Sequence, residues 1–185
     1  MKLKLFAILS LASVSLLTSC LKDTPYMDVS NTQPIIEFGQ SVANGVYGPN
    51  GYYGAFPFAG DTAGGPVATY DTAVALVLAS PQVLNSSVTV TVAIDTTQLS
   101  AFNNSQGTSI TMLPANLYSI PQMTATIKAG YRVGSIPVTI YLSNFPAAHQ
   151  YGLPIKIVSA VDNGEGSEPI VVSGNSGTFM WLFQR

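Results

Sequence analysis

The amino-acid sequence predicts an all-β fold, a sandwich of antiparallel strands. Apolar and polar residues alternate with a period of two in most of the chain beyond residue 20, as they do in strands with one buried face. Glycine, proline and asparagine separate these short runs, and these residue types are typical of turns. Since residues 34–185 are enough for one hydrophobic core, we expect a single sandwich domain there.

Seven segments carry a strand pattern, and we expect about seven to eight strands in total. The segments are residues 35–38, 73–79, 88–94, 123–128, 136–142, 153–157 and 178–183. Residues 73–79 and 178–183 are apolar on both faces, which is typical of strands in the centre of a sheet. Pro137 has no N–H to donate, so it should lie at a sheet edge or a bulge. This spacing of strands and turns favours an immunoglobulin-like antiparallel β-sandwich.

One segment, residues 95–102, predicts helical structure. Asp95 or a threonine after it is able to cap a turn, and Leu99 and Phe102 then lie on one side at a spacing of three. We expect a single helical turn that connects the two sheets.

The first twenty residues predict an export signal with a lipid anchor. Lys2 and Lys4 precede an apolar run, residues 5–17, that is shorter than the ~20 residues needed to span a bilayer. Leu17-Thr18-Ser19-Cys20 has the pattern of a lipobox, in which the thiol receives a diacylglycerol. We therefore expect residues 1–19 to be a lipoprotein signal peptide and Cys20 to attach the protein to a membrane.

Residues 20–33 predict a flexible tether, because they are polar and have no apolar periodicity. Cys20 is the only cysteine, so we expect no disulfide.

The composition and the motifs exclude two classes of function. Only 9% of the residues are charged, the formal net charge is −2, and the basic residues beyond the leader are scattered, whereas nucleic-acid surfaces gather cations. His149 is the single histidine, and no nucleophile elbow, phosphate loop or metal motif is present. We expect neither nucleic-acid binding nor catalysis, and no cofactor.

Residues 44–68 predict a long Gly- and aromatic-rich loop inserted between two strands, and such loops are often functional. Exposed aromatic rings stack on the apolar faces of sugars, and tyrosine offers a large contact area at low entropic cost. The alternative is that the rings fold back and cap the open end of the sandwich. The candidate glycan-binding residues are Tyr47, Asn50, Tyr52, Tyr53, Phe56 and Phe58.

A turn near the end of the chain concentrates oxygen ligands, which calcium prefers. The weak calcium candidates are Asp162, Asn163, Glu165 and Glu168. The turn lacks the spacing of an EF-hand, and a polar hairpin explains the same residues without a metal.

Several short motifs, taken in order, resemble one family. They are Val88–Asp95, Phe102-Asn103, Met112-Leu113-Pro114, Tyr118, Ala125–Gly130 and Tyr151–Ile157. Together they resemble domain of unknown function 1735, which occurs in surface lipoproteins of Bacteroidetes, and the similarity runs from about Ile35 to about Ala160. The resemblance implies an immunoglobulin-like module of polysaccharide-utilisation lipoproteins, and it supplies no catalytic residues.

Two further short motifs resemble signals of Bacteroidetes envelope proteins. Cys20-Leu21-Lys22-Asp23 partly resembles the export signal of surface lipoproteins, so the expected location is the outer membrane, with surface exposure. Three Asp-Thr-Ala or Asp-Thr-Thr triplets resemble an O-glycosylation pattern, and their candidate sites are Thr62, Thr72 and Thr96.

The function that these observations favour is a non-catalytic, lipid-anchored surface protein. It would bind or position polysaccharide near an outer-membrane glycan import system. The alternative is a structural or protein–protein interaction subunit of the envelope or of an appendage, and the apolar segment 178–183 would then be able to pair with a partner's sheet edge.

Overall fold

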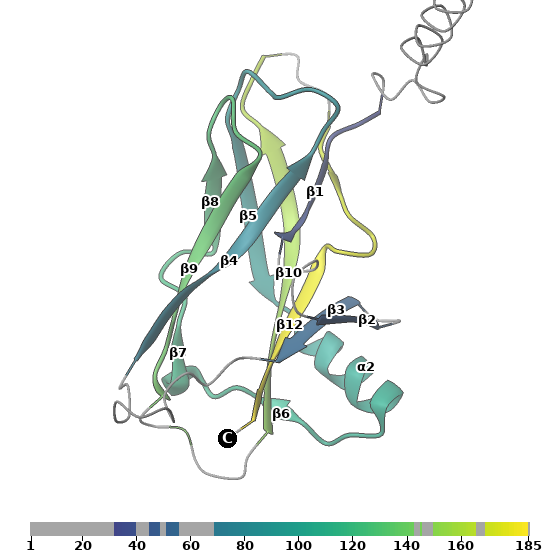
Figure 1. Ribbon diagram of the computed structural model, residues 1–185, viewed down its shortest axis with the longest axis vertical. Coiled ribbons are helices and arrows are strands. Elements are labelled where there is room, and N and C mark those ends of the chain that lie inside the picture. The colour runs from purple at the N-terminus through teal and green to yellow at the C-terminus, as the bar shows by residue number, and fades with distance from the viewer. Residues whose placement is uncertain are drawn as a thin grey trace, which may run out of the picture. The chain divides into compact units, whose positions relative to one another are not determined.

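The computed structural model describes residues 32–39, 45–48, 51–55, 69–142, 145, 150–165 and 169–184, which belong to one compact unit (Figure 1). The predicted signal peptide, Cys20 and most of the predicted tether lie outside these residues. No helix in the described part of the chain is long and apolar enough to cross a membrane.

Two β-sheets form the domain, and the first has five strands in the order β11-β1-β4-β9-β7. Its strands are β1 (Ile35–Phe38), β4 (Tyr70–Ala79), β7 (Tyr118–Ser119), β9 (Val133–Ile140) and β11 (Val171–Val172). All of its pairs are antiparallel except β1 with β11.

The second sheet has seven strands, in the order β2-β3-β12-β10-β5-β8, with β6 paired to β10. Its strands are β2 (Gly45–Gly48), β3 (Gly51–Ala55), β5 (Val88–Ile94), β6 (Thr111–Met112), β8 (Thr124–Ile127), β10 (Gln150–Asp162) and β12 (Thr178–Gln184). The pairs β12–β3 and β10–β6 are parallel.

The predicted all-β sandwich is confirmed, and each of the seven predicted strand segments is a strand. The structure has more strands than the seven or eight expected for two reasons. Three strands, β6, β7 and β11, have only two residues each, which is too short for a period-two pattern to be recognised. A further pair, β2 and β3, lies in the segment that was expected to be a loop.

Alternate residues of the strands fill the space between the sheets. Phe38 of β1 and Phe179 of β12 approach from opposite sheets with ring centroids 6.0 Å apart, and both side chains are buried. The Phe179 and Trp181 rings meet edge to face at 5.2 Å, a geometry that aromatic pairs prefer. One continuous core therefore joins the two sheets.

The expectations for the two strands that are apolar on both faces are confirmed. β4 lies between β1 and β9, and β12 lies between β3 and β10. Because both edges of β12 are paired within the domain, the hypothesis that residues 178–183 pair with a partner's strand is wrong.

Pro137 lies at the edge position that was expected of it. β9 pairs with β4 along its whole length, where Pro137 is opposite Ala73, whereas β7 pairs only with Thr139 and Ile140. On that side of Pro137 no strand of the described chain requires an N–H donor.

A helix, α2 (Thr96–Gln106), follows β5, and a short 3₁₀ helix, η3 (Ala115–Leu117), precedes β7. Two expectations for α2 were wrong. The helix has eleven residues instead of one turn, and it connects β5 to β6 within the seven-stranded sheet instead of connecting the two sheets. The sequence of α2 is mostly polar, and only Leu99 and Phe102 are buried. The stability of the helix therefore depends on the packing of these two side chains and on its caps.

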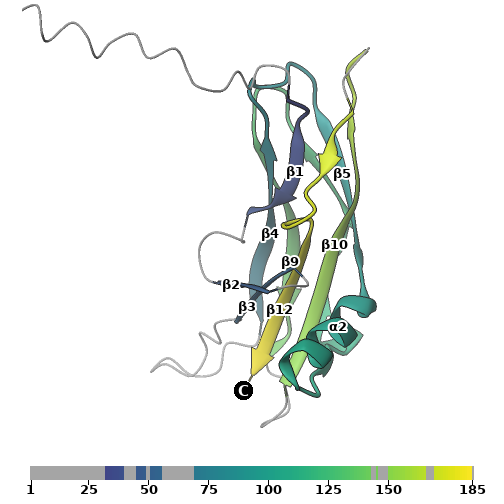
Figure 2. The same ribbon diagram turned by 90° about the vertical axis from the view of Figure 1, so that its right-hand side faces the viewer.

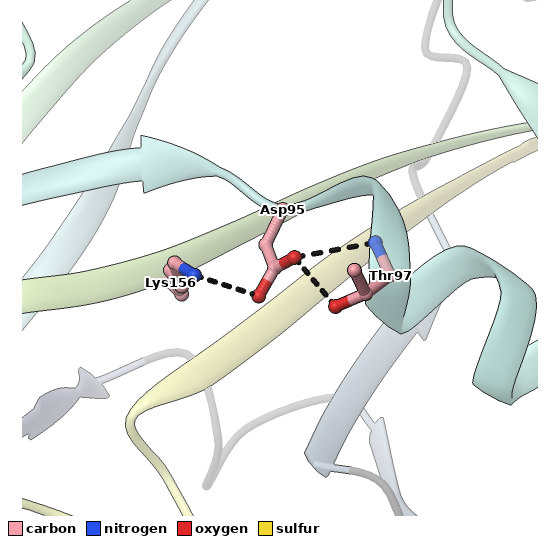
Figure 3. A network of polar contacts seen from close by, with 3 residues as sticks. All are labelled: Asp95, Thr97 and Lys156. Atoms are coloured by element: carbon pink, nitrogen blue, oxygen red, sulfur yellow. Dashed lines mark hydrogen bonds and ion pairs between the residues drawn. The ribbon is translucent and has the colours of Figure 1, made fainter.

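Asp95 caps the N-terminus of α2 and binds a strand at the same time (Figure 3). Its Oδ1 accepts hydrogen bonds from the Thr97 hydroxyl at 2.6 Å and from the Thr97 N–H at 3.2 Å. Its Oδ2 lies 3.1 Å from Nζ of Lys156 on β10. The Thr97 hydroxyl is the main cause of a pKa below the ordinary Asp95 value of 3.8, and Lys156 lowers the pKa further, against the opposing effect of desolvation.

We expect the Asp95→Asn variant to lose part of the acid sensitivity of the domain. Because folding lowers the pKa of Asp95, its stabilisation is fully present above pH 3.8 and is lost as the pH falls through the folded pKa. Asparagine retains the cap but not the ion pair, so the loss at pH 7 should be at most about 1 kcal/mol. Thermal unfolding between pH 7 and pH 2 measures this. A difference in melting temperature that did not shrink towards low pH would contradict the role of the carboxylate.

The strand register defines two ends of the sandwich. Ile35 pairs with Ala79, and Val88 pairs with Asp162. The turns after β4, β8 and β10 therefore lie at the end where β1 begins, which we name the proximal end. The opposite, distal end carries α2 and the last residues of β12 (Figure 2).

Candidate functional site

A pocket of about 250 Å³ opens at the distal end between α2 and the seven-stranded sheet. We name it the α2 groove. It is lined by Phe102, Gln106, Thr108, Ile110, Gln150, Leu182 and Phe183. These residues come from the second half of α2, the loop after it, the start of β10 and the end of β12.

The apolar wall of the groove is a small second core outside the sandwich. Leu99 and Phe102 of α2 pack with Ile110 and with Met180 of β12. The close approach of the helix depends on Gly152 of β10: a Cβ there would lie 2.8 Å from Leu99 Cδ1 and 3.2 Å from Met180 Sδ. A larger side chain would push α2 away from the sheet and widen the groove.

Asn103 fixes the loop that forms the other wall. Its Oδ1 accepts hydrogen bonds from the Thr108 hydroxyl at 2.8 Å and from the Ile110 N–H at 3.0 Å. Its Nδ2 donates to the Ile110 carbonyl at 2.7 Å. Gly107 ends the helix in the left-handed conformation, with φ of 64°, which glycine adopts without strain. The loop is therefore held by three bonds from one side chain.

The chemistry of the α2 groove suits a small uncharged ligand. None of the seven residues that line it in the described part of the chain carries an ionisable side chain. Gln106 and Gln150 line the groove with exposed amides, which carry donors and an acceptor for a ligand. Gln106 Nε2 also donates to the Ser105 hydroxyl at 3.4 Å. Phe102, Ile110 and Leu182 supply apolar surface beside them. A sugar ring, with apolar C–H faces and hydroxyls around its edge, matches this combination.

Part of the segment 44–68, which carries the predicted glycan-binding residues, forms strands. Residues 45–48 and 51–55 are strands β2 and β3, so the prediction of a loop without strands is wrong there. Tyr47 pairs with Tyr52, while Tyr53 pairs with Val46 on one side and Met180 on the other. Two glycines in each of these short segments, Gly45 and Gly48 in β2 and Gly51 and Gly54 in β3, obscured the pattern in the sequence.

The hairpin brings part of that segment next to the groove. Ala55 of β3 is opposite Leu182, which lines the groove. Asn50, Phe56 and Phe58 lie outside the described residues. The hairpin therefore continues the sheet that carries the groove.

Two of the weak calcium candidates, Asp162 and Asn163, bond the turn after β10 to the start of β5 and the loop before it. Asp162 Oδ1 accepts from the Ser86 hydroxyl and, at 3.0 Å, from the Gly164 N–H. Asn163 Nδ2 donates to the hydroxyls of Ser87 and Thr89. Glu165 is exposed, and Glu168 lies outside the described residues. No cluster of three metal-ligating side chains is found in the described part of the chain. The strands on either side of this turn, β10 and β11, belong to different sheets, so the turn is not a hairpin.

Two of the O-glycosylation candidates, Thr72 and Thr96, are described, and neither lines the groove. Thr96 is exposed at the first turn of α2, whereas Thr72 is half-buried within β4, opposite Val138. Of these two O-glycosylation candidates, Thr96 is the more accessible. Thr62 and His149 lie outside the described residues.

Sequence reasoning missed the residues of the α2 groove. Gln106, Thr108, Gln150 and Leu182 are far apart in the chain and carry no motif. The available signals were indirect: the Phe102-Asn103 pair and a glycine, Gly152, inside a strand.

The sequence of this chain was compared with protein families and with curated proteins. A family model described as an N-terminal domain matches residues 42–164. No curated protein matches the sequence.

Solved structures from Bacteroides share the fold at low sequence identity. A proposed carbohydrate-binding protein from Bacteroides ovatus is 14% identical with a TM-score of 0.56, and the match covers 81% of this chain and 36% of that one. A two-domain protein of unknown function from Bacteroides fragilis is 12% identical with a TM-score of 0.54, covering 82% of this chain and 45% of that one. This chain therefore spans less than half of either structure.

The resemblance stated from the sequence motifs is confirmed. A multidomain protein that includes domain of unknown function 1735, from Bacteroides ovatus, is 16% identical with a TM-score of 0.51. That match covers 80% of this chain and 44% of the other.

Proposed function

We propose that this chain, which belongs to the family of N-terminal domains whose model matches residues 42–164, is a non-catalytic, lipid-anchored surface module. The module would bind and position polysaccharide. We place it in the outer membrane, near a glycan import system. The observation that carries the proposal is the α2 groove, in which apolar side chains adjoin exposed amides and none of the described lining residues is ionisable.

The volume and the charge of the groove indicate how many sugar units it binds and whether they are charged. A volume of about 250 Å³ is below the range of about 300–1,000 Å³ of pockets that enclose drug-sized ligands. It therefore suits one sugar unit of a longer chain. The absence of charge among the lining residues favours neutral glycans over uronic or sulfated ones.

We expect the double variant Gln106→Ala/Gln150→Ala to bind neutral glycan about 30-fold more weakly, since each lost hydrogen bond costs about 1 kcal/mol. Affinity electrophoresis through gels that contain mannan, xylan, galactomannan or starch would find the glycan, and calorimetry would measure the change. Polygalacturonate and heparin would serve as charged glycans for comparison.

The matched control is Gln82→Ala/Gln122→Ala, which removes two exposed amides outside the groove. Glycan affinity should remain unchanged in this control. Equal losses in both double variants, or no retention of the unmodified protein on any neutral glycan, would rule out the groove as a sugar site.

A structural role is the second candidate, and one observation favours it. The chain covers only 36% and 45% of the first two solved structures that it matches, so in those proteins the same fold is joined to further chain. On this hypothesis the module would hold a partner domain or subunit in position and would not touch sugar. Retention of the protein on a neutral glycan through Gln106 and Gln150 would decide against it.

A further inference from the structure

The large apolar side chains that remain exposed are gathered at the proximal end. Seven such side chains are exposed in the described part of the chain, and their positions in the strands share a pattern. Ile35 and Val171 are the first residues of β1 and β11 and pair with each other. Val133 is the first residue of β9, and Val161 is the last but one of β10.

The turns at the same end carry two more of these side chains. Val83 lies in the loop after β4, and Tyr131 lies in the turn between β8 and β9. The two segments are joined, because the Gly130 N–H donates to the Leu84 carbonyl at 2.9 Å. Tyr131 is 64% exposed and Val133 is 61% exposed. We name Ile35, Val83, Tyr131, Val133, Val161 and Val171 the apolar collar.

Basic residues accompany the collar, together with the exposed carboxylate of Glu165 in the turn after β10. Lys128 and Arg132 flank Tyr131 in the turn, and they are two of the three basic residues in the described part of the chain. Arg132 donates to the Ser80 carbonyl, so its side chain is held across the two turns. The carboxylate of Asp162, at the same end, is engaged by Ser86 and Gly164.

This composition is that of a surface which meets lipid headgroups. Tyrosine places an apolar ring and a polar hydroxyl at the interface, and lysine and arginine bind anionic phosphates there. Isolated exposed apolar residues are ordinary on soluble proteins, whereas their concentration at one end marks an interaction surface.

The segment between Cys20 and the domain enters the domain at the end that carries the collar. Thr32, where the described domain begins, lies next to this end, and it is twelve residues after Cys20. Twelve residues span at most about 40 Å, so a domain anchored at Cys20 cannot move far from the bilayer. We propose that the apolar collar rests on the lipid headgroups and that the distal end, with the α2 groove, is turned away from the membrane. This inference rests on the lipid anchor of the proposed function.

The seventh exposed side chain, Val158, provides a depth control. It is 52% exposed, but it lies four residues before the end of β10, about 13 Å along the strand. The headgroup layer of one leaflet is only about 5–8 Å thick. Val158 should therefore remain in water while Tyr131 enters the interface.

The test uses the lipidated full-length protein in vesicles of phosphatidylethanolamine and phosphatidylglycerol. The variant Tyr131→Trp places a fluorophore in the collar, and Val158→Trp places one at the control position; both also contain the buried Trp181. Replacing part of the lipid by its brominated form should quench about half of the added tryptophan signal in Tyr131→Trp. The added signal in Val158→Trp should not change.

The outcomes separate this inference from the proposed function. A protein that fails to co-sediment with the vesicles would overturn the lipid anchor. An anchored protein with no quenching in Tyr131→Trp, or with equal quenching in both variants, would overturn the collar as a membrane contact. If the quenching in Tyr131→Trp disappeared when the protein was diluted in the membrane, the collar would contact a second copy of the chain or another protein instead of lipid. Mannan or xylan retention is measured on the same variants and should be unchanged.

Discussion

Replacing Cys20 by alanine is expected to move the protein from the membrane fraction to the soluble fraction. Cys20 is the only thiol in the chain and follows Leu17-Thr18-Ser19 in the lipobox pattern. Two or three acyl chains contribute on the order of 20 kcal/mol of membrane binding, at about 0.8 kcal/mol for each buried CH₂. Without them the collar alone supplies only a weak membrane contact. Fractionation by ultracentrifugation with immunoblotting, and metabolic labelling with an alkyne fatty acid, measure the change.

The matched control is Ser19→Ala, which keeps a small residue before the cysteine and should leave both the label and the membrane fraction intact. Thr32–Arg185 form one compact unit, so the melting temperature of the domain should be the same with and without Cys20. A Cys20→Ala protein that still sediments with membranes after a salt wash would contradict the anchor.

The strands were the part of the fold that the sequence determined most directly. The bounds of β1 and β5 agree with the predicted segments 35–38 and 88–94. In β5, Val88, Val90 and Val92 are buried, while Thr89 and Thr91 between them are half-buried. A period of two gives this pattern wherever one face of a strand meets the core, so no knowledge of the partner strands was needed.

The hairpin β2–β3 was not predictable in the same way. Its strands have four and five residues, and glycine stands at Gly45, Gly48, Gly51 and Gly54. Glycine weakens strand propensity and leaves no apolar pattern to read. The hairpin is fixed by its parallel pairing with β12, more than 120 residues later in the chain, and such a long-range contact leaves no local signal.

The length of α2 also escaped prediction, for a related reason. The sequence showed the cap at Asp95 and the pair Leu99 and Phe102, but the residues after Phe102 are polar. The last turn forms because Asn103 binds the loop at Thr108 and Ile110 and because Gly107 ends the helix. These contacts depend on the chain returning to the helix, which a pattern of hydrophobic residues does not report.

The aromatic row between the sheets leads to the prediction with the largest effect on stability. We expect Phe179→Ala to lower the free energy of unfolding by about 3–5 kcal/mol, because it removes a fully buried ring and leaves a cavity. Phe179 is 1% exposed and contacts Phe38 and Trp181, at centroid distances of 6.0 and 5.2 Å. It therefore joins the two sheets at one point. Urea unfolding measures the loss as a lower midpoint at an unchanged slope.

Leu182→Ala is the matched control for Phe179→Ala on the same strand, since it too removes an apolar side chain from β12. Leu182 is only half-buried and lies on the face that carries α2, where it lines the groove. Its loss of stability should be about half that of Phe179→Ala or less, while its glycan affinity should fall. Phe183 belongs to the sandwich core and also lines the groove, whereas Phe179 belongs to the core and does not line the groove. Phe179→Ala should therefore bind glycan normally under conditions where it remains folded. Comparable stability losses in the two variants would mean that the strand does not divide its faces between the core and the groove.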